Sequence, residues 1–174
     1  MPLEAINIIG AGQCGTLLSI MLARQGFEVD VFERNDDPRI NDAEAGRSIN
    51  LALAARGINA LVRTGLYNQI APMLMPMRGR VVPYGQNDSE VIYSVTRSDL
   101  NEVLLNVADG IPNVRLHFRQ QAIGYDAPDR TVHMRDLNDN SLYQVEALPL
   151  IAADGAGSII RRSFDGSDTF GGIE

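Results

Sequence analysis

The stretch of residues 5–15 constrains the fold of this chain more than any other. An apolar run ends in three spaced glycines, Gly10, Gly12 and Gly15, and a helical pattern follows. We interpret it as a strand, a tight turn (residues 10–15, the glycine turn) and a helix. Gly10 would allow the sharp turn, Gly12 would leave room for a diphosphate, and Gly15 would let the helix pack close to the strand. The positive end of the helix would then face the phosphates.

The residues after the glycine turn strengthen this interpretation, because three spaced glycines alone are weak evidence. Apolar residues at helical spacing, Leu17, Ile20 and Met21, predict the buried side of a helix that ends at Gly26. Residues 27–32 then predict a second strand. The order strand, glycine turn, helix, strand is the one that a dinucleotide-binding unit needs.

Glu33 follows this second strand, about 20 residues after the glycines, where dinucleotide-binding folds place a ribose-binding acid. A carboxylate there can accept hydrogen bonds from both ribose hydroxyls, and it would repel a 2′-phosphate. We therefore expect an unphosphorylated adenosine, as in FAD or NAD. The alternative is that Glu33 is a solvated acid at the end of a strand.

Composition excludes several classes of protein. The 15 basic and 22 acidic residues of this 174-residue chain give a net charge of −7, which argues against nucleic acid as a partner. The sequence contains no apolar stretch long enough to cross a bilayer and no signal-peptide pattern at its start. A single cysteine, Cys14, rules out an internal disulfide and favours a reducing, cytoplasmic compartment. We expect Cys14 to pack as a small apolar residue rather than to react.

The remainder of the chain predicts an α/β fold in which a parallel sheet carries antiparallel insertions. The length corresponds to about one domain. We assign its parts as follows: parallel-sheet core at about residues 1–53, 97–118 and 148–165, a small β excursion at about 76–95, and a β-meander at about 122–147. Residues 73–77 are expected to form a packed loop, because prolines interrupt them.

A second acid follows the last predicted strand of the parallel sheet. Asp154 and Gly155 stand where that strand ends, and ligands of open α/β sheets bind at the carboxyl ends of strands. Ser158 is expected to cap the helix that follows. His117 and His133 lie in alternating strands without other ligands at metal-site spacing, so we predict no metal site for them.

These features occur together in one known family. The matching segments are the glycine turn, Glu33 and residues 46–53, 76–80, 83–85, 94–97 and 154–161. Together they resemble the kynurenine 3-monooxygenases, which are FAD-dependent aromatic hydroxylases. The glycine turn and the Asp-Gly motif are shared by many such hydroxylases, whereas residues 46–53 and the surroundings of Arg80 and Tyr84 are more specific.

The resemblance implies a Rossmann-like FAD-binding fold and an enzyme in which NADPH reduces FAD. One atom of O₂ is then placed on the aromatic ring of L-kynurenine, beside its amino group. The FAD site that the resemblance implies comprises Gly10, Gly12, Cys14, Gly15, Phe32, Glu33, Arg34, Asn35, Arg47, Ala52, Arg97, Ala122, Asp154 and Gly155. No catalytic residue and no metal ligand are assigned.

The resemblance also assigns Arg80 and Tyr84 to the carboxylate of the amino-acid substrate. A guanidinium offers two parallel donors to a carboxylate, and a phenol adds a third. Without the resemblance, both residues would be interpreted as ordinary strand-surface side chains. Likewise, Arg47 would be a solvated loop cation, and Arg97 would serve a helix terminus or an ion pair.

Two departures from the family affect these expectations. The connection between Arg80 and Tyr84 is shorter here, which puts the choice of substrate in doubt. Family members also continue well beyond this length, with a second Gly-Asp motif, most of the substrate-binding sheet and a helical C-terminal part. We therefore expect the chain to be the N-terminal portion of such an enzyme and to be inactive alone, because it cannot close a water-poor pocket.

Two other functions stay open at this point. The chain could be a non-catalytic adenine-dinucleotide-binding module that keeps the adenosine half of the site. It could also be an NAD-dependent dehydrogenase, although that class needs neither the meander nor the late Asp-Gly motif. The sequence does not predict an oligomeric state.

Overall fold

The computed structural model describes residues 5–40, 49–77, 92–147 and 149–165. The chain forms two compact units. The larger unit comprises Met1–Asn41 and Leu104–Glu174, and the smaller unit comprises Asp42–Val103. The larger unit holds a parallel sheet and a β-meander, and the smaller one holds an antiparallel sheet with short helices.

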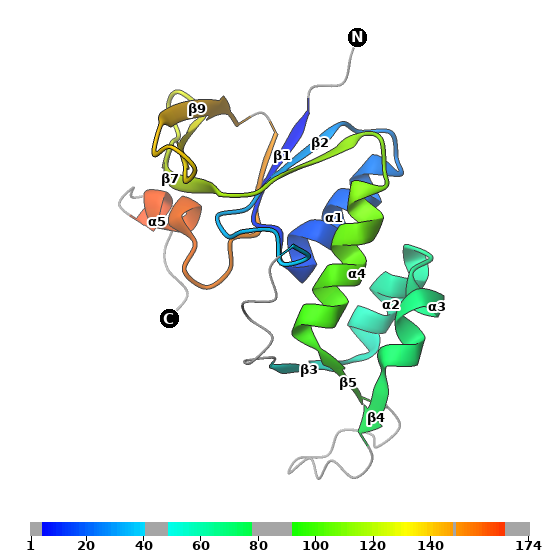
Figure 1. Ribbon diagram of the computed structural model, residues 1–174. Helices are drawn as coiled ribbons and strands as arrows, with labels where there is room; N and C mark the ends of the chain where they lie inside the picture. The colour runs from blue at the N-terminus through cyan, green and yellow to red at the C-terminus, as the bar shows by residue number, and fades with distance from the viewer. Residues whose placement is uncertain (1–4, 41–48, 78–91, 148, 166–174) are drawn as a thin grey trace. The chain divides into compact units, whose positions relative to one another are not determined.

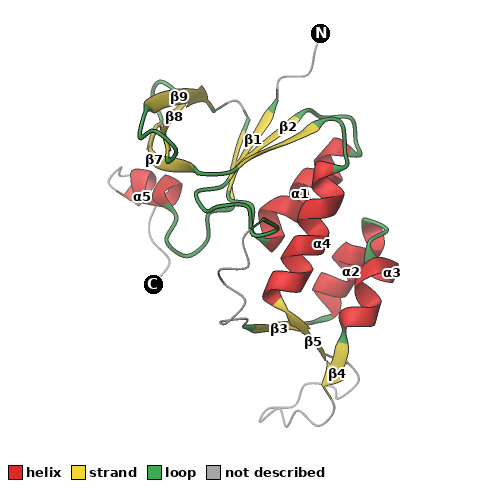
Figure 2. Cartoon of the chain, viewed as in Figure 1, coloured by secondary structure: helices red, strands yellow, loops and turns green. Residues whose placement is uncertain are grey.

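A four-stranded parallel sheet forms the centre of the larger unit (Figures 1 and 2). Its strands, in spatial order, are β10 (Leu150–Ala152), β1 (Ile6–Ile9), β2 (Val29–Phe32) and β6 (Val114–His117). Ile9 lies beside both Ala152 and Phe32, and Phe32 lies beside His117. The carboxyl ends of all four strands therefore meet at one edge, which confirms the predicted parallel sheet.

Helix α1 (Gln13–Ala23) packs against strands of this sheet through small residues. Its buried residues are Gly15, Thr16, Ser19, Ile20 and Ala23. The predicted apolar side was only partly right, because Leu17 and Met21 are half-buried. The hydroxyl of Thr16 donates to the carbonyl of Ala11 at 3.0 Å, so a small polar side chain is buried at little cost and the helix lies close to the sheet.

The predicted meander lies between β6 and β10 in the chain and shares a core with the parallel sheet. Its strands, in order, are β7 (Gln120–Asp126), β8 (Thr131–Asp136) and β9 (Leu142–Glu146). Helix α5 (Ile159–Asp165) packs on β7. The shared core consists of Ile9, Phe32, Val132, Met134, Ala147 and Ile160. Because side chains alternate along a strand, Ile9 and Phe32 face the meander while Ile8 and Val31 face the other side.

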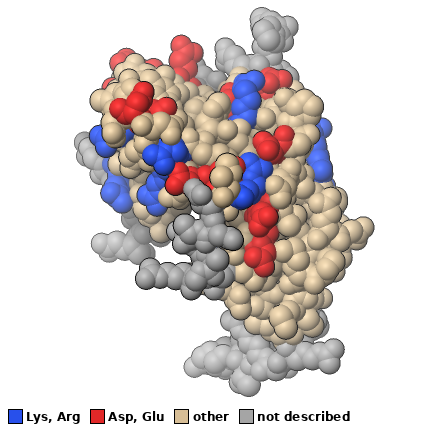
Figure 3. Space-filling view, in the orientation of Figure 1, with Lys and Arg blue, Asp and Glu red and all other residues tan. Residues whose placement is uncertain are grey.

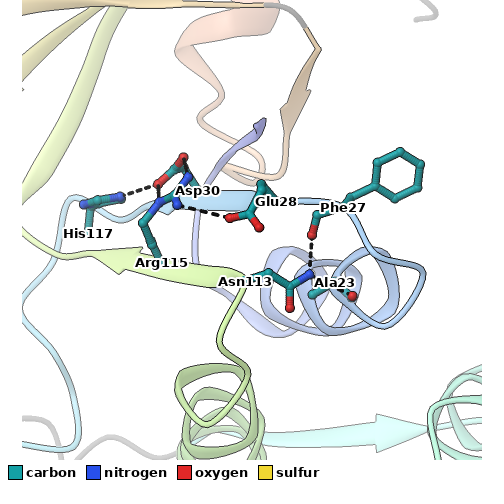
Figure 4. Close-up of polar contacts among 7 residues, drawn as sticks. All are labelled: Ala23, Phe27, Glu28, Asp30, Asn113, Arg115 and His117. Carbon is teal, nitrogen blue, oxygen red and sulfur yellow. Dashed lines mark hydrogen bonds and ion pairs between the residues drawn. The ribbon is translucent and has the colours of Figure 1, made fainter. Parts of the chain in front are cut away.

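Strand β2 begins two residues later than predicted, at Val29. Figure 4 shows the reason at the end of α1: the side-chain amide of Asn113 donates to the carbonyl of Phe27 at 2.5 Å. The same amide donates to the carbonyl of Ala23 at 2.9 Å. A side chain thus takes the place of a neighbouring strand at Phe27, so this residue belongs to the turn after α1.

The smaller unit contains a three-stranded antiparallel sheet. Its strands, in spatial order, are β3 (Asn50–Leu53), β5 (Ile92–Thr96) and β4 (Met75–Met77). Between β3 and β4 lie α2 (Ala55–Arg63), α3 (Tyr67–Ile70) and the 3₁₀ helix η2 (Ala71–Met73). Helix α4 (Arg97–Asp109) directly follows β5.

Two features of the smaller unit differ from the sequence prediction. Residues 50–53 were assigned to the parallel-sheet core, but β3 pairs with β5 in the antiparallel sheet. Residues 73–77 were predicted to form a packed loop and a β excursion was predicted from about residue 76, but Met75–Met77 already form strand β4, whose residues are exposed, Met75 by 71%. Proline is tolerated in β4 because the strand lies at the edge of its sheet.

An ion-pair cluster joins β2 to β6 on the larger unit (Figure 4). The Arg115 guanidinium donates from Nε and Nη2 to the two carboxylate oxygens of Asp30, each at 2.7 Å. His117 Nε2 lies 2.7 Å from Asp30 Oδ1. Burial by itself would raise the pKa of Asp30, but hydrogen bonds from Arg115 and His117 outweigh burial and lower this pKa well below its ordinary value.

Charges of both signs lie close together on the face of the molecule drawn in Figure 3. Ion pairs of the larger unit join such charges: Arg39 contacts Asp37 at 2.6 Å and Asp109 at 3.1 Å, and Arg119 contacts Asp36 at 2.6 Å. Among the described residues, the structure has no helix whose length and apolar character would suit a membrane span.

The Asp30 cluster predicts a pH-dependent stability. Since the pKa of Asp30 is lower in the folded chain, its contribution is present above the ordinary carboxyl pKa of 3.8 and is lost as the pH falls toward the folded value. Replacing Asp30 with Asn should lower the free energy of unfolding by about 1 to 3 kcal/mol at pH 7. In urea titrations, this difference in the free energy of unfolding should become smaller as the pH is lowered from 5 to 2.

The matched control is Asp129→Asn, in an exposed turn of the meander. We expect its effect on stability to be small and nearly independent of pH. An Asp30→Asn effect of equal size at pH 7 and pH 2 would contradict the assigned role of the charge.

Candidate functional site

The glycine turn brings three backbone segments together at the carboxyl edge of the parallel sheet. Gly10 has a φ of +105°, and a Cβ there would lie 2.5 Å from the carbonyl oxygen of Ala153, just after β10. A Cβ on Gly15 would overlap the carbonyl oxygen of Gly10. The predicted tasks of these two glycines, a sharp turn and close packing of the helix, are confirmed.

Gly12 differs from the other two glycines, because its missing side chain leaves open space. Its φ and ψ of −71° and 179° suit any residue, and a Cβ there would meet no described atom within 4 Å. Gly12 is the N-cap of α1 and provides no side-chain hydrogen bond to the helix. Because no side chain of Gly12 occupies this end of the helix, an anion could approach the N–H groups of the first turn.

Two features of the start of α1 affect this anion site. The first turn contains no acidic residue, so the positive end of the helix is not neutralised from within. Cys14 was expected to pack as a small apolar residue, but it is exposed. That correction follows from helix geometry, because position 14 lies roughly 100° around the helix axis from Gly15, which packs against Gly10 and Ala153.

Glu33 points at the glycine turn. Its Oε2 accepts a hydrogen bond from the backbone N–H of Ala11 at 2.9 Å, and its Oε1 accepts one from the N–H of Asn35 at 2.9 Å. Each carboxylate oxygen has a second lone pair and can accept a further hydrogen bond. The predicted position of the acid, beside the glycines and just after β2, is confirmed.

The neighbours of Glu33 differ in their exposure. Arg34 and Asn35 are exposed, as ligand-contacting residues would be. The Phe32 side chain is buried in the core shared with the meander, and its ring stacks on His117 with centroids 4.8 Å apart. Phe32 reaches the glycine turn through its backbone, since its carbonyl accepts from the N–H of Gly10 at 2.8 Å.

Asp154 adds a second carboxylate beside the glycine turn. A Cβ on Gly10 would lie 3.0 Å from the Cα of Asp154, so the two residues touch. Asp154 Oδ2 accepts from the N–H of Ile159 at 2.9 Å, while Oδ1 is buried and has no hydrogen-bond partner among the described residues. Gly155 follows with a φ of +78°. A buried acceptor without a donor suits the hydroxyl group of a ligand.

Ser158 caps α5 as predicted, since its hydroxyl oxygen accepts from the N–H of Arg161 at 3.0 Å. Ala122 lies on β7, half-buried and packed against the shared core. Ala52 and Arg97 belong to the smaller unit: Ala52 is exposed on β3, and the N–H of Arg97 donates to the carbonyl of Ile49 at 3.1 Å.

The predicted residues Arg47, Arg80 and Tyr84 lie outside the described residues. Within the described residues, no cluster of three or more His, Cys, Asp and Glu side chains could hold a metal ion. His117 is engaged with Asp30, and Nδ1 of His133 lies 3.4 Å from the amide of Gln144.

Sequence reasoning missed two contributors to the site. The backbone N–H of Ala11 anchors Glu33, and a backbone group leaves no signal in side-chain identity. Arg119 contacts the loop that carries Glu33, but it precedes a meander strand and no motif marks it.

Comparisons with known proteins agree with this geometry. The profile of a family described as "FAD binding domain" matches residues 3–172. A kynurenine 3-monooxygenase of Stenotrophomonas maltophilia (strain K279a) is 42% identical over 173 residues, which cover 93% of this chain and 38% of that protein. One of Legionella pneumophila (strain Corby) is 38% identical over 169 residues, which cover 91% of this chain and 37% of that protein.

A solved structure shows the same fold. The flavin-dependent monooxygenase PieE, in complex with FAD and substrate, aligns with a TM-score of 0.75 at 16% identity and covers 95% of this chain and 33% of that chain. This chain thus spans less than two-fifths of the length of these relatives. The sequence-based resemblance and the predicted fold class are confirmed.

The glycine turn predicts unequal effects for two identical substitutions. Gly15→Ala should destabilise the chain by about 2 to 4 kcal/mol, because its methyl group would overlap a backbone carbonyl. Gly12→Ala should change stability by less than about 1 kcal/mol, because its backbone conformation suits alanine while alanine is a poorer N-cap than glycine. Thermal and urea unfolding of both variants checks this, and similar losses in the two would contradict the geometry.

Proposed function

The chain belongs to the family of FAD binding domains, and we propose that its larger unit holds the adenosine and diphosphate of FAD. The observation that carries this proposal is the hydrogen bond by which Glu33 reaches the glycine turn, where α1 starts with a glycine N-cap and no acid in its first turn. A diphosphate needs donors without an opposing negative charge, and a ribose needs an acceptor nearby. The first turn of α1 offers the donors, and Glu33 brings the acceptor to the same place from 22 residues along the chain.

Each group at the site has a task in this proposal. The N–H groups in the first turn of α1 would bind the diphosphate, with Gly12 leaving room for it. Glu33 would accept from the ribose hydroxyls while Ala11 and Asn35 hold its carboxylate in place. The buried Oδ1 of Asp154 would accept from a further hydroxyl of the cofactor. Bound FAD would supply the redox chemistry and the activation of O₂.

We further propose that the chain is the N-terminal part of an NADPH-dependent aromatic hydroxylase that acts on L-kynurenine in the cytoplasm. The kynurenine 3-monooxygenases at 42% and 38% identity support this substrate. Arg80 and Tyr84 would bind the substrate carboxylate, and Arg47, Ala52, Arg97 and Ala122 would complete the FAD site. Since the chain spans about 38% of such a relative, we expect no hydroxylation from it alone.

A non-catalytic module that binds adenine dinucleotides is the second candidate. It is favoured by the fact that the groups converging on the glycine turn would all bind the adenosine and diphosphate end of a cofactor. Flavin absorbance in the purified protein would support the first candidate. Binding of ADP without retention of flavin would support the second.

The test of the proposed function is Glu33→Ala, measured by calorimetric titration with ADP and with FAD. We expect binding to weaken by about 1 to 3 kcal/mol, roughly 5- to 150-fold in Kd, because the ribose loses its acceptor. Glu28→Gln is the matched control, an acid next to β2 that pairs with Arg115 at 3.2 Å. Unchanged affinity in Glu33→Ala, or an equal loss in Glu28→Gln, would remove Glu33 from the site.

A second measurement isolates the charge of Glu33. Adenosine 2′,5′-bisphosphate should bind more weakly than 5′-AMP, because its 2′-phosphate would meet the carboxylate. This difference should narrow or reverse in Glu33→Ala. If the unmodified chain and Glu33→Ala prefer the bisphosphate equally, the ribose does not lie at Glu33.

A further inference from the structure

Arg119 lies where the loop that carries Glu33 meets the meander. We call residues 33–37 the ribose loop. The backbone N–H of Arg119 donates to the carbonyl of Asn35 at 3.1 Å, and the N–H of Gln120 donates to the carbonyl of Glu33 at 2.8 Å. On the other side, the N–H of Glu33 donates to the carbonyl of His117 at 2.8 Å. The ribose loop thus continues the pairing of β2 with β6 onto the start of β7.

The side chain of Arg119 adds a second tie to the same loop. Its Nη1 donates to Asp36 Oδ1 at 2.6 Å, and its Nη2 donates to the carbonyl of Leu137 at 2.6 Å. The N–H of Leu137 returns a bond of 2.7 Å to the carbonyl of Arg119. One planar guanidinium therefore bridges the ribose loop and the turn between β8 and β9, a geometry that a lysine could not reproduce.

The backbone of Arg119 is in an unfavourable conformation. Its φ of +58° lies in the left-handed region, which residues with a Cβ rarely adopt. Arg130, in the turn between β7 and β8, has a similar φ of +51°. Arg130 is exposed, and its backbone bonds join it to Ala127 and Ala147 within the meander region rather than to the ribose loop. The chain thus supplies a matched pair of arginines that differ in their contact with the loop.

We propose that Arg119 is a positioning residue that holds the Glu33 carboxylate on the N–H of Ala11. Its backbone bonds to Asn35 and its guanidinium to Asp36, so it holds the two residues that follow Arg34 in the ribose loop. Glu33 Oε1 accepts from the N–H of Asn35, so a displacement of Asn35 moves the carboxylate as well. The consequence for nucleotide affinity rests on the proposed function, whereas the hold on the carboxylate does not.

The competing explanation is that Arg119 only stabilises the meander, because it also bonds to Leu137. The two explanations predict different effects of removing the Arg119 side chain. If Arg119 only stabilises the meander, its removal would loosen the turn at Leu137 and leave Glu33 in place. If Arg119 positions Glu33, its removal would release the N–H groups of Ala11 and Asn35, which lie outside the meander and donate to the same carboxylate.

The test compares amide hydrogen exchange, followed by NMR, in Arg119→Met, Arg119→Gly, Arg130→Met and Arg130→Gly. Glycine relieves the left-handed strain, so Arg119→Gly removes the guanidinium while sparing the fold. We expect exchange at Ala11 and Asn35 to accelerate by about tenfold in both Arg119 variants and to stay unchanged in both Arg130 variants. Amides of the buried strand β1 report any global unfolding.

Arg119→Lys provides a rescue control. Its ammonium can reach Asp36 but cannot bridge to Leu137 at the same time, so exchange at Ala11 and Asn35 should fall between the wild type and Arg119→Met. Titration with ADP completes the series: we expect about tenfold weaker binding in Arg119→Met and less than twofold change in Arg130→Met.

The outcomes separate this proposal from the proposed function. Unchanged exchange at Ala11 and Asn35 in both Arg119→Met and Arg119→Gly would overturn it. ADP binding that is weakened by Glu33→Ala but not by Arg119→Met would overturn its predicted consequence for nucleotide affinity. Faster exchange at both amides supports the hold of Arg119 on Glu33. If ADP affinity is then unaffected in Arg119→Met and Glu33→Ala alike, the ribose-binding role of Glu33 fails while its positioning by Arg119 stands.

Discussion

The close approach of backbone segments at the edge of the parallel sheet is the constraint on which the rest of the structure depends. Gly10 lies against Ala153, and Gly15 lies against Gly10, with no space for a Cβ at either glycine. This contact sets the start of α1 beside the end of β10. It thereby places the first turn of the helix, the acid after β2 and the acid after β10 around one point.

Two ion pairs hold the neighbouring residues Asp36 and Asp37 at the end of the ribose loop. Arg119 binds Asp36 from the meander side, and Arg39 binds Asp37 at 2.6 Å while reaching Asp109 of α4 at 3.1 Å. Such pairs contribute little to stability when exposed, but they restrict where a loop can lie. The arrangement is one way to prepare a carboxylate for a ligand without burying it.

Much of the site was predictable because its signals are local. The spacing of the glycines, the position of Glu33 after the second strand and that of Asp154 after the last strand are each set by a few consecutive residues. Errors arose where neighbours in space decide the outcome. Thr16 and Ser19 are buried because α1 lies close to the sheet, Asn50–Leu53 pairs with β5 rather than joining the parallel sheet, and Cys14 faces outward.

By itself, the sequence determined the order of strands and helices, the glycine turn and the kind of side chain at each strand end, because these follow from periodicity, turn chemistry and motif spacing. Only the tertiary structure decided that Glu33 bonds to Ala11, that Asp154 keeps a buried oxygen without a donor, and that Arg119 ties the ribose loop to the meander. Each of these contacts joins groups far apart along the chain or involves a backbone atom. Their partners are therefore chosen by packing rather than by residue type.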